Sequence, residues 1–152
     1  MGKIKKGEFF CGTSNIALQG NKSTFPLDMQ SKSRLTYYST IFNSLEINAS
    51  FYKVPQKKTF ARWAAETPDD FRFTVKLWKE ISHARSLNFK SEDLSSFMDA
   101  VSGTGNKLGC ILLQLPKSTG LANLEKTEDL LDQIAESQFE QTTRIALELR
   151  NP

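Results

Sequence analysis

The feature that most constrains the fold of this chain is a regular alternation of short apolar segments with longer amphipathic ones. The last two apolar segments, "LGCILLQL" and "IALEL", are almost continuously apolar. Such runs are typical of parallel strands whose two faces are both covered. A strict alternation of strand and helix therefore predicts an α/β fold in which right-handed crossovers join parallel strands.

Apolar periodicity and turn residues place five strands and four main helices along the chain. The expected strands are 9–11, 44–48, 71–76, 108–115 and 144–149, and the expected helices are 34–42, 57–66, 91–102 and 124–137. Ser33 is expected to cap the first helix and Ser91 the third. The connections 15–32 and 77–90 are long, and loops of that length are uncommon unless they contribute to function.

The residues that follow the strands distinguish between α/β folds. The loop "CGTSN" lacks both common Gly-rich phosphate-binding motifs, so a nucleotide site of the Rossmann or P-loop type is poorly supported. Polar residues instead gather at the carboxyl ends of most strands, which is typical of TIM barrels. Because a full barrel has eight strands, the sequence predicts a TIM-barrel-like arrangement of (βα) repeats, an incomplete barrel of about five parallel strands and four main helices.

Composition argues against several classes of protein. The net charge of +3 and the pI of 8.9 are too modest to indicate nucleic-acid binding by themselves. His83 is the sole histidine, and Cys11 and Cys110 form no C-x-x-C pair, so we expect no disulfide framework and no metal site or cofactor. No apolar run approaches the length of a membrane span. Because nothing in the sequence indicates export or oxidised cysteine, the cytoplasm is the expected compartment.

Six segments, spread over most of the chain, resemble one known family. They are "GTS" (12–14), "LEINASFYKVP" (45–55), "W…TPDDFRFTVK" (63–76), "ISHAR" (81–85), "KLGCILLQLP" (107–116) and "LELRNP" (147–152). Taken together, in this order, they resemble the YecE-like family, also called domain of unknown function 72. The resemblance implies a TIM barrel of unknown activity.

The resemblance also implies that residues 1–152 are a single domain corresponding to the amino-terminal part of such a barrel. The sheet would then have two open, apolar edges, which are prone to association. We therefore expect self-association or a requirement for a missing carboxyl-terminal segment, and a stable monomer in sedimentation would contradict this expectation.

Alternation along the strands predicts which side chains face the interior of the barrel. The candidate catalytic residues at the carboxyl ends are Glu46, Lys76 and Glu148. Either carboxylate would serve as a general base, and Lys76 would bind an anion or act as a nucleophilic amine. The candidate ligand-binding residues are Asn48, His83, Gln114 and Arg150. Arg150 is suited to clamping a phosphate or a carboxylate.

Each of these residues also has a purely structural interpretation. Charges inside a barrel must be paired, and an ion pair of Lys76 with Glu46 or Glu148 would satisfy that need without any ligand. His83 lies in a long loop, where a lone histidine is often a local hydrogen-bonding group. Phe51, just after the second strand, is either a stacking surface or packing beneath the loop.

Three functions remain open at this point. The first is a polar pocket that binds a small anionic or sugar-like ligand, with or without catalysis. The second is nucleic-acid binding or processing, although one histidine does not support a three-metal nuclease site. The third is a non-catalytic scaffold whose polar residues stabilise the fold. It remains open because the TIM-barrel fold alone does not show which function a protein has.

Overall fold

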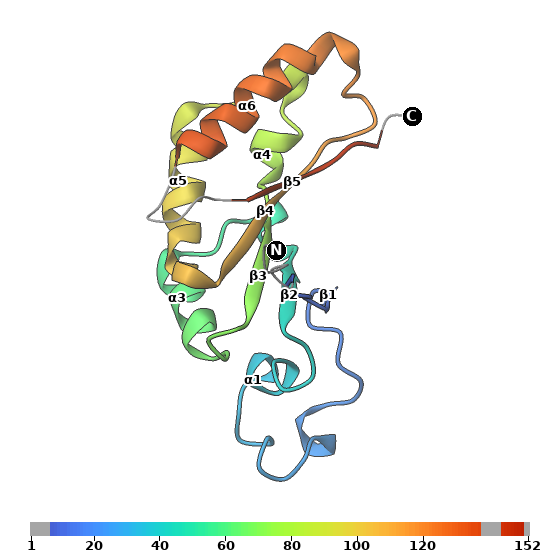
Figure 1. Cartoon of the computed structure of the whole chain (residues 1–152), viewed down its shortest axis with the longest axis vertical. Helices are drawn as coiled ribbons and strands as arrows, with labels where there is room; N and C mark the ends of the chain where they lie inside the picture. Colours follow the sequence, from blue (N-terminus) through green and yellow to red (C-terminus); the bar gives the residue numbers. More distant parts are fainter. Residues whose placement is uncertain (1–6, 138–143, 151–152) are drawn as a thin grey trace, which may run out of the picture.

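The computed structural model describes residues 7–137 and 144–150 as a single parallel sheet with helices packed against it. The strands are β1 (Gly12–Ser14), β2 (Ser44–Ile47), β3 (Arg72–Lys76), β4 (Leu108–Gln114) and β5 (Ile145–Glu148). Each strand pairs in parallel with the next one along the chain. This order confirms the predicted α/β, TIM-barrel-like class, and the sheet is not closed (Figure 1).

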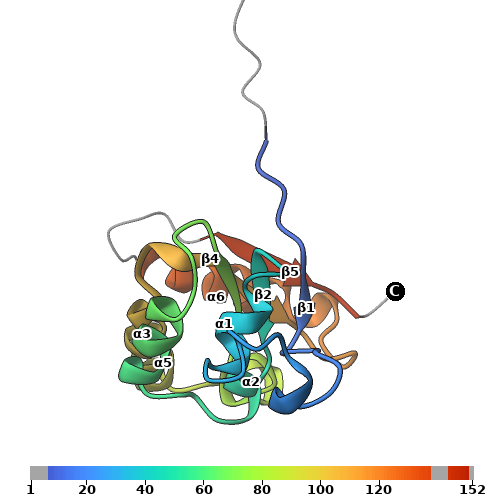
Figure 2. The same ribbon diagram turned by 90° about the horizontal axis from the view of Figure 1, so that it is seen from below.

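Four main helices occupy the connections, as the sequence predicts. They are α1 (Arg34–Tyr38), α3 (Lys57–Ala65), α5 (Ser91–Val101) and α6 (Leu124–Glu136). Helices α3 and α5 lie side by side on the same side of the sheet (Figure 1, Figure 2). Two one-turn helices, α2 (Ala49–Tyr52) and α4 (Lys79–Ser82), follow β2 and β3 directly and were not expected. Four short 3-10 segments complete the connections: Lys22–Thr24, Arg85–Leu87, Ser102–Lys107 and Leu121–Asn123.

Alternation along the strands separates a buried face from a polar one. Leu45 and Ile47 of β2 are buried against the helices, as are the residues at alternate positions of β3 and β4. The intervening side chains, including Glu46 and Lys76, lie on the opposite face and are only partly buried, except for Gln114, which is buried. In a closed barrel this opposite face lines the interior. In the described strands the polar side chains therefore lie on one face of the sheet, as the sequence predicts.

The first strand was predicted at the wrong place. Residues 9–11 form no ladder, because the side chain of Asn43 takes the place of a neighbouring strand: its Oδ1 accepts from the Cys11 amide at 2.7 Å, and its Nδ2 donates to the Phe9 carbonyl at 2.9 Å. Pairing begins at Gly12, where a Cβ atom would overlap the Ser44 carbonyl. The strand thus begins where a glycine lets the two backbones approach closely.

Two helix predictions also need correction. The expected helix 34–42 ends at Tyr38, because the hydroxyls of Ser39 and Thr40 donate back to the carbonyls of Thr36 and Tyr37, each at 2.8 Å. Such bonds compete with the helical ladder. Ser91 is the first residue of α5 and not its cap, which is Lys90 without a side-chain cap bond. The predicted Ser33 cap is present, since its hydroxyl accepts from the Thr36 amide at 3.0 Å.

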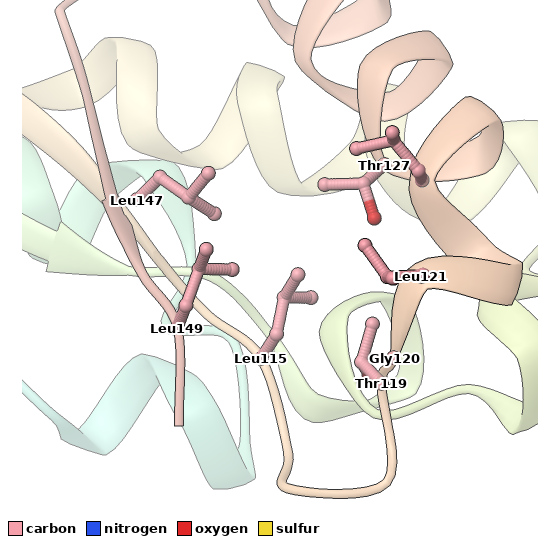
Figure 3. Close-up of a pocket in the computed structure, with 8 residues that line it drawn as sticks. Leu115, Thr119, Gly120, Leu121, Thr127, Leu147 and Leu149 are labelled. Atoms are coloured by element: carbon pink, nitrogen blue, oxygen red, sulfur yellow. The ribbon is translucent and has the colours of Figure 1, made fainter. Parts of the chain in front are cut away.

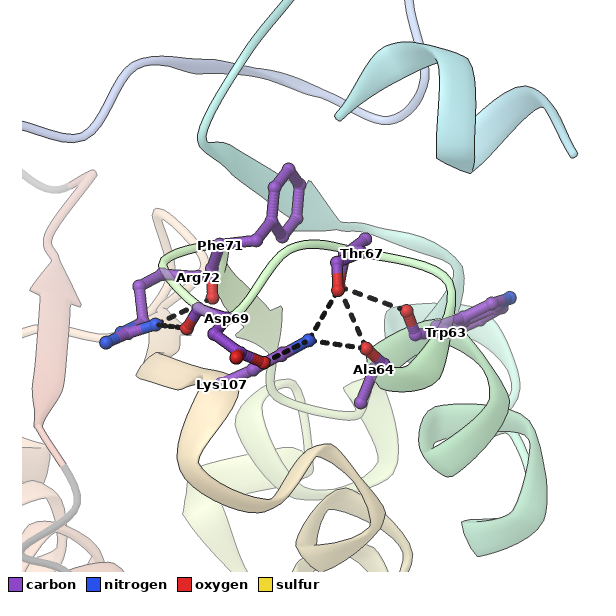
Figure 4. A network of polar contacts seen from close by, with 7 residues as sticks. All are labelled: Trp63, Ala64, Thr67, Asp69, Phe71, Arg72 and Lys107. Carbon is purple, nitrogen blue, oxygen red and sulfur yellow. Dashed lines mark hydrogen bonds and ion pairs between the residues drawn. The ribbon is translucent and has the colours of Figure 1, made fainter. Parts of the chain in front are cut away.

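A buried lysine ties the end of α3 to the start of β4 (Figure 4). Lys107 is 7% exposed, and its Nζ donates to the carbonyls of Ala64 at 2.7 Å and Thr67 at 2.6 Å. The exposed carboxylate of Asp69 lies 3.8 Å from the same nitrogen. The lysine thus satisfies carbonyls at the carboxyl end of a helix, where a cation is favoured. This contact lies at the amino ends of the strands, away from the candidate site.

The sequence also led to expectations about membrane spans, domain extent, cellular location and self-association. Within the described ranges no helix is long and apolar enough to cross a membrane. The single-domain extent 1–152, the cytoplasmic location and the self-association at open edges remain predictions. The last two residues of the "LELRNP" segment lie outside the described residues.

Candidate functional site

A continuous line of polar contacts crosses the carboxyl ends of β3, β4 and β5. Lys76 Nζ donates to Gln114 Oε1 at 2.8 Å, and Gln114 Nε2 donates to Glu148 Oε2 at 2.6 Å. Arg150 Nε completes the line by donating to Glu148 Oε1 at 3.0 Å. Gln114 and Glu148 are partners in the β4–β5 register, so the parallel pairing itself places them together. The structure thus brings four of the seven candidate residues into one network.

An aromatic ring supports the lysine at one end of this line. Lys76 Nζ lies 4.7 Å from the centroid of the Phe51 ring, which is a cation–π distance. The ring is held there by its neighbour, the fully buried Ser50, whose hydroxyl donates to the Lys76 carbonyl at 2.6 Å and contacts the Ile47 carbonyl at 2.9 Å. The one-turn helix α2 therefore positions Phe51 against the end of β3. The sequence left two interpretations of Phe51 open, a stacking surface or packing beneath the loop. The ring has features of both, since it is partly buried and also faces a charged group.

His83 joins the same region through Phe51. The two rings meet edge to face, with centroids 4.9 Å apart, and Ser82 Oγ lies 3.0 Å from His83 Nδ1. Partial burial of the ring, followed by the positive charges of Lys76 and Arg150, lowers the pKa of His83 below its ordinary 6.5. His83 is therefore neutral at pH 7, although the residue as a whole is exposed.

Glu148 is held in its ionised form. The hydrogen bond from Gln114 is the largest cause that lowers the pKa of this carboxyl, and the hydrogen bond from Arg150 is the next. The side chain is 43% exposed, so water also solvates it. A carboxylate of this kind suits a role as hydrogen-bond acceptor or charge partner better than a role as general acid.

A second polar group forms at the ends of β1 and β2. Glu46 Oε1 accepts from Ser14 Oγ at 3.0 Å and from Asn48 Nδ2 at 2.8 Å, and Asn48 Nδ2 also contacts Ser14 Oγ. Asn48 is the residue before α2, but its side chain does not cap that helix and is directed to Glu46 instead. The arrangement fixes a carboxylate on the polar face of the sheet.

These two groups are separate in the described part of the chain. No hydrogen bond or ion pair within residues 7–137 and 144–150 joins Glu46 to Lys76, and Gln114 stands between Lys76 and Glu148. The described residues thus contain neither of the direct ion pairs that the structural interpretation invoked. Sequence reasoning missed Ser14 and Ser50 as supporting residues. Two sequence features could have identified them: the "GTS" segment for Ser14, and the position of Ser50 directly before Phe51-Tyr52.

The donor groups favour organic or anionic ligands. Among the described residues, no three His, Cys, Asp or Glu side chains lie close enough together to hold a metal ion. What the mouth of the sheet offers is an ammonium and a guanidinium, Lys76 and Arg150, beside a neutral imidazole and an amide. Such groups hydrogen-bond to anionic oxygens and to hydroxyls.

The titration of His83 gives a direct test of this electrostatic arrangement. Because His83 is the sole histidine, its proton resonances are unambiguous in NMR spectra. We expect a midpoint below 6.5, and Lys76→Met should raise it by removing a nearby positive charge. Since the folded pKa is the lower one, the free energy of unfolding should fall as pH drops from the unfolded pKa through the folded value.

The matched control for this titration is Lys79→Met. Lys79 is an exposed lysine of α4 that does not contribute to the shift of His83. Its replacement should leave the midpoint where it is. A midpoint at or above 6.5 in the unaltered chain, or equal effects of the two replacements, would contradict the arrangement described here.

The fold and the polar strand ends define a TIM-barrel-like α/β protein, and comparison with solved structures agrees. A DUF72 family protein from Enterococcus faecalis V583 superposes with a TM-score of 0.64 and 23% identity, over 78% of this chain and 44% of that one. A DUF72 family protein from Thermotoga maritima MSB8 gives a TM-score of 0.61 and 24% identity, over 93% of this chain and 55% of that one. At these identities the likeness establishes the fold alone.

Sequence comparison supplies the family. The family model described as "Protein of unknown function DUF72" matches residues 10–152, and the chain belongs to this family. It is 32% identical over 100 residues to the UPF0759 protein YecE of Escherichia coli K12, covering 66% of this chain and 37% of YecE. It is 31% identical to the UPF0759 protein YunF of Bacillus subtilis 168, covering 62% of this chain and 36% of YunF. The match thus spans little more than a third of either curated relative.

Proposed function

We propose that the carboxyl ends of β3, β4 and β5 bind a small anionic or sugar-like ligand. The side chains at these strand ends have the groups needed to bind an oxyanion and neighbouring hydroxyls. The observation that carries this proposal is the environment of Lys76. Its ammonium group contacts a neutral amide oxygen and an aromatic face, and no carboxylate of the described residues lies within 4.0 Å of it. A cation left without a direct counter-ion at the functional end of a barrel is a natural anion site.

The other polar groups of the site would orient the bound ligand. Arg150 stands at the other end of the same line and offers further guanidinium donors. Glu148 and Gln114 between them accept and donate hydrogen bonds, which suits the hydroxyls of a sugar. Glu46, held by Ser14 and Asn48, is the candidate general base if the bound ligand reacts.

Thermal unfolding in the presence of candidate ligands tests the proposal. We expect inorganic phosphate, pyrophosphate or a sugar phosphate to raise the midpoint of unfolding, because a ligand that binds only the native state stabilises it by about 2.7 kcal/mol at a hundred times its Kd. Lys76→Met should weaken that binding at least tenfold by calorimetry. Lys79→Met, with the same change on an exposed lysine three positions away, should bind as the unaltered chain does.

The alternatives make different predictions in the same experiments. Absence of any shift with phosphates and with neutral sugars would contradict a ligand site and leave the polar residues a structural role. Nucleic-acid binding would appear as an affinity that falls steeply with salt, because phosphate contacts release counter-ions. Equal losses from Lys76→Met and Lys79→Met would reject the assigned position of the site.

A further inference from the structure

Two hydrogen-bond acceptors are left open at the end of β2, beside the anion site proposed at Lys76. Glu46 Oε1 accepts from Ser14 Oγ at 3.0 Å and from Asn48 Nδ2 at 2.8 Å. Within residues 7–137 and 144–150, no donor is bonded to the other oxygen of Glu46 or to the amide oxygen of Asn48. Both residues are only half-buried. One charged and one neutral oxygen are therefore available to a ligand at this strand end.

The strand ends hold these acceptors in place. Ser14 and Glu46 are partners in the β1–β2 register, so the parallel pairing itself brings the hydroxyl to the carboxylate. Asn48 precedes α2 without capping it, which leaves its amide group to bond to Glu46. Because the three side chains brace one another, the open oxygens are ordered before a ligand binds. Such pre-organisation lowers the entropic cost of binding.

Open acceptors determine which chemical groups can lie against them. The carboxylate of Glu46 repels a phosphate, and an apolar group would desolvate that carboxylate without a partner. A hydrogen-bond donor suits the place, which means a hydroxyl or an ammonium group. Since the two open oxygens belong to different side chains, each can accept from one of two neighbouring hydroxyls. Lys76, on the next strand, disfavours a second cation nearby.

Strand geometry sets the separation between these acceptors and Lys76. Glu46 is the register partner of Thr74, and Lys76 lies two residues further along β3. With strands about 4.8 Å apart and a rise of about 3.3 Å per residue, the Cα atoms of Glu46 and Lys76 are about 8 Å apart. An extended five-carbon sugar phosphate has about this length, since its bonds are about 1.5 Å long. A two-carbon phosphate ester is too short to reach both groups.

We propose that Glu46 and Asn48 form a hydroxyl-recognition subsite, and that the ligand is a sugar phosphate with two neighbouring hydroxyls remote from its phosphate, a proposal that rests on the anion site proposed at Lys76. The phosphate lies against the ammonium group of Lys76. The two hydroxyls donate to the open oxygens of Glu46 and Asn48. Ser14 is a positioning residue, because it orients the carboxylate and does not contact the ligand.

An apolar groove on the other face of β5 does not suit such hydroxyls. Its volume is about 200 Å³, and Figure 3 shows leucines directed into it from two sides. Leu147 and Leu149 flank Glu148 along the chain and are 42% and 64% exposed, so they lie on the face opposite to the polar line. A wall of leucine offers a hydroxyl no hydrogen-bond partner. The hydroxyl-recognition subsite therefore belongs on the polar face.

Calorimetric titration of the chain with four probes tests this assignment. The probes are inorganic phosphate, ribose 5-phosphate, 2-deoxyribose 5-phosphate and phosphoethanolamine. Ribose 5-phosphate should bind at least tenfold more tightly than 2-deoxyribose 5-phosphate, because the missing hydroxyl leaves one acceptor of the subsite unpaired. It should also bind more tightly than inorganic phosphate, which reaches Lys76 alone.

Four variants assign the preference for ribose to particular residues. Glu46→Gln and Asn48→Ala should each bring the ratio of the two sugar-phosphate affinities close to one. Asn48 makes no cap bond and has helical backbone angles, so alanine should preserve α2. Glu80→Gln is the matched control on an exposed glutamate of α4, and it should leave the ratio unchanged. Lys76→Met should weaken both sugar phosphates equally, because both carry the phosphate.

The outcomes distinguish this subsite from the anion site on which it depends. Equal binding of the two sugar phosphates, with phosphate still bound through Lys76, would reject the subsite alone. A ribose preference that survives both Glu46→Gln and Asn48→Ala would overturn the assignment to these residues. Tighter binding of phosphoethanolamine than of ribose 5-phosphate would assign the open oxygens to an ammonium group instead. Absence of binding by all four probes would reject the anion site and the subsite together.

Discussion

Replacing Lys107 with methionine is expected to lower the free energy of unfolding by about 3 kcal/mol. Methionine keeps most of the stem of the side chain but removes the ammonium that binds the carbonyls of Ala64 and Thr67. The Ala64 carbonyl would keep the hydrogen bond from Thr67 Oγ1 at 3.1 Å, but the Thr67 carbonyl would lose its donor in a buried place, and an unsatisfied buried acceptor costs about 1–3 kcal/mol. For a chain of this size the midpoint of thermal unfolding should fall by about 6–12 °C.

An exposed ion pair provides the matched control for this replacement. Lys57 Nζ lies 2.8 Å from Asp99 Oδ1, but the two side chains are 55% and 69% exposed. Lys57→Met should therefore cost less than about 1 kcal/mol, because water screens and replaces the interaction. Equal losses from the two replacements, measured by urea unfolding, would show that Lys107 is no more than another surface lysine.

A second large effect is expected from a single methyl group. Gly103→Ala should destabilise the fold by about 2 kcal/mol, because the new Cβ atom would overlap the carbonyl oxygen of Lys57 and press on Phe60. The φ angle at Gly103 is one that alanine adopts freely, so the effect is steric and not conformational. To accept the methyl group, α3 would have to move away from the segment that follows α5.

Hydrogen exchange and a second glycine test this explanation. In Gly103→Ala the amides of α3 should exchange faster than those of α6, because the displacement is local to α3. Gly7→Ala places a methyl group where no atom lies within 4 Å, and its stability should change by less than about 0.5 kcal/mol. An unchanged or higher stability of Gly103→Ala would mean that α3 is not packed as closely as described.

The fold was predictable because its main signal is local in sequence. Alternating burial, as in Leu45 and Ile47 against Glu46, and the turn between each strand and helix are encoded within a few residues. The prediction failed where a side chain replaced a backbone partner. Asn43 holds residues 9–11 in the place of a strand, and the hydroxyls of Ser39 and Thr40 end α1 early. Hydrophobic pattern alone contains no information on such bonds.

The candidate site was predictable in its position but not in its contacts. Parallel strands end at the same edge, so Lys76, Gln114 and Glu148 had to lie on one side of the sheet. Which of them contact each other depends on strand register and on side-chain rotamers. Gln114 lies between Lys76 and Glu148 because it is two positions beyond Leu112, the register partner of Lys76, and directly opposite Glu148.

The sequence by itself determined the class of fold, the face on which polar residues lie and the end of the sheet where they gather. The physical reason is that periodicity two and the order of strands are properties of neighbouring residues. Only the tertiary structure decided that Lys76 has Phe51 and a neutral amide as partners, and that Ser14 joins Glu46 from 32 residues away. It also decided that Leu147 and Leu149 are uncovered, because burial depends on which element packs over a strand, and no single segment encodes that.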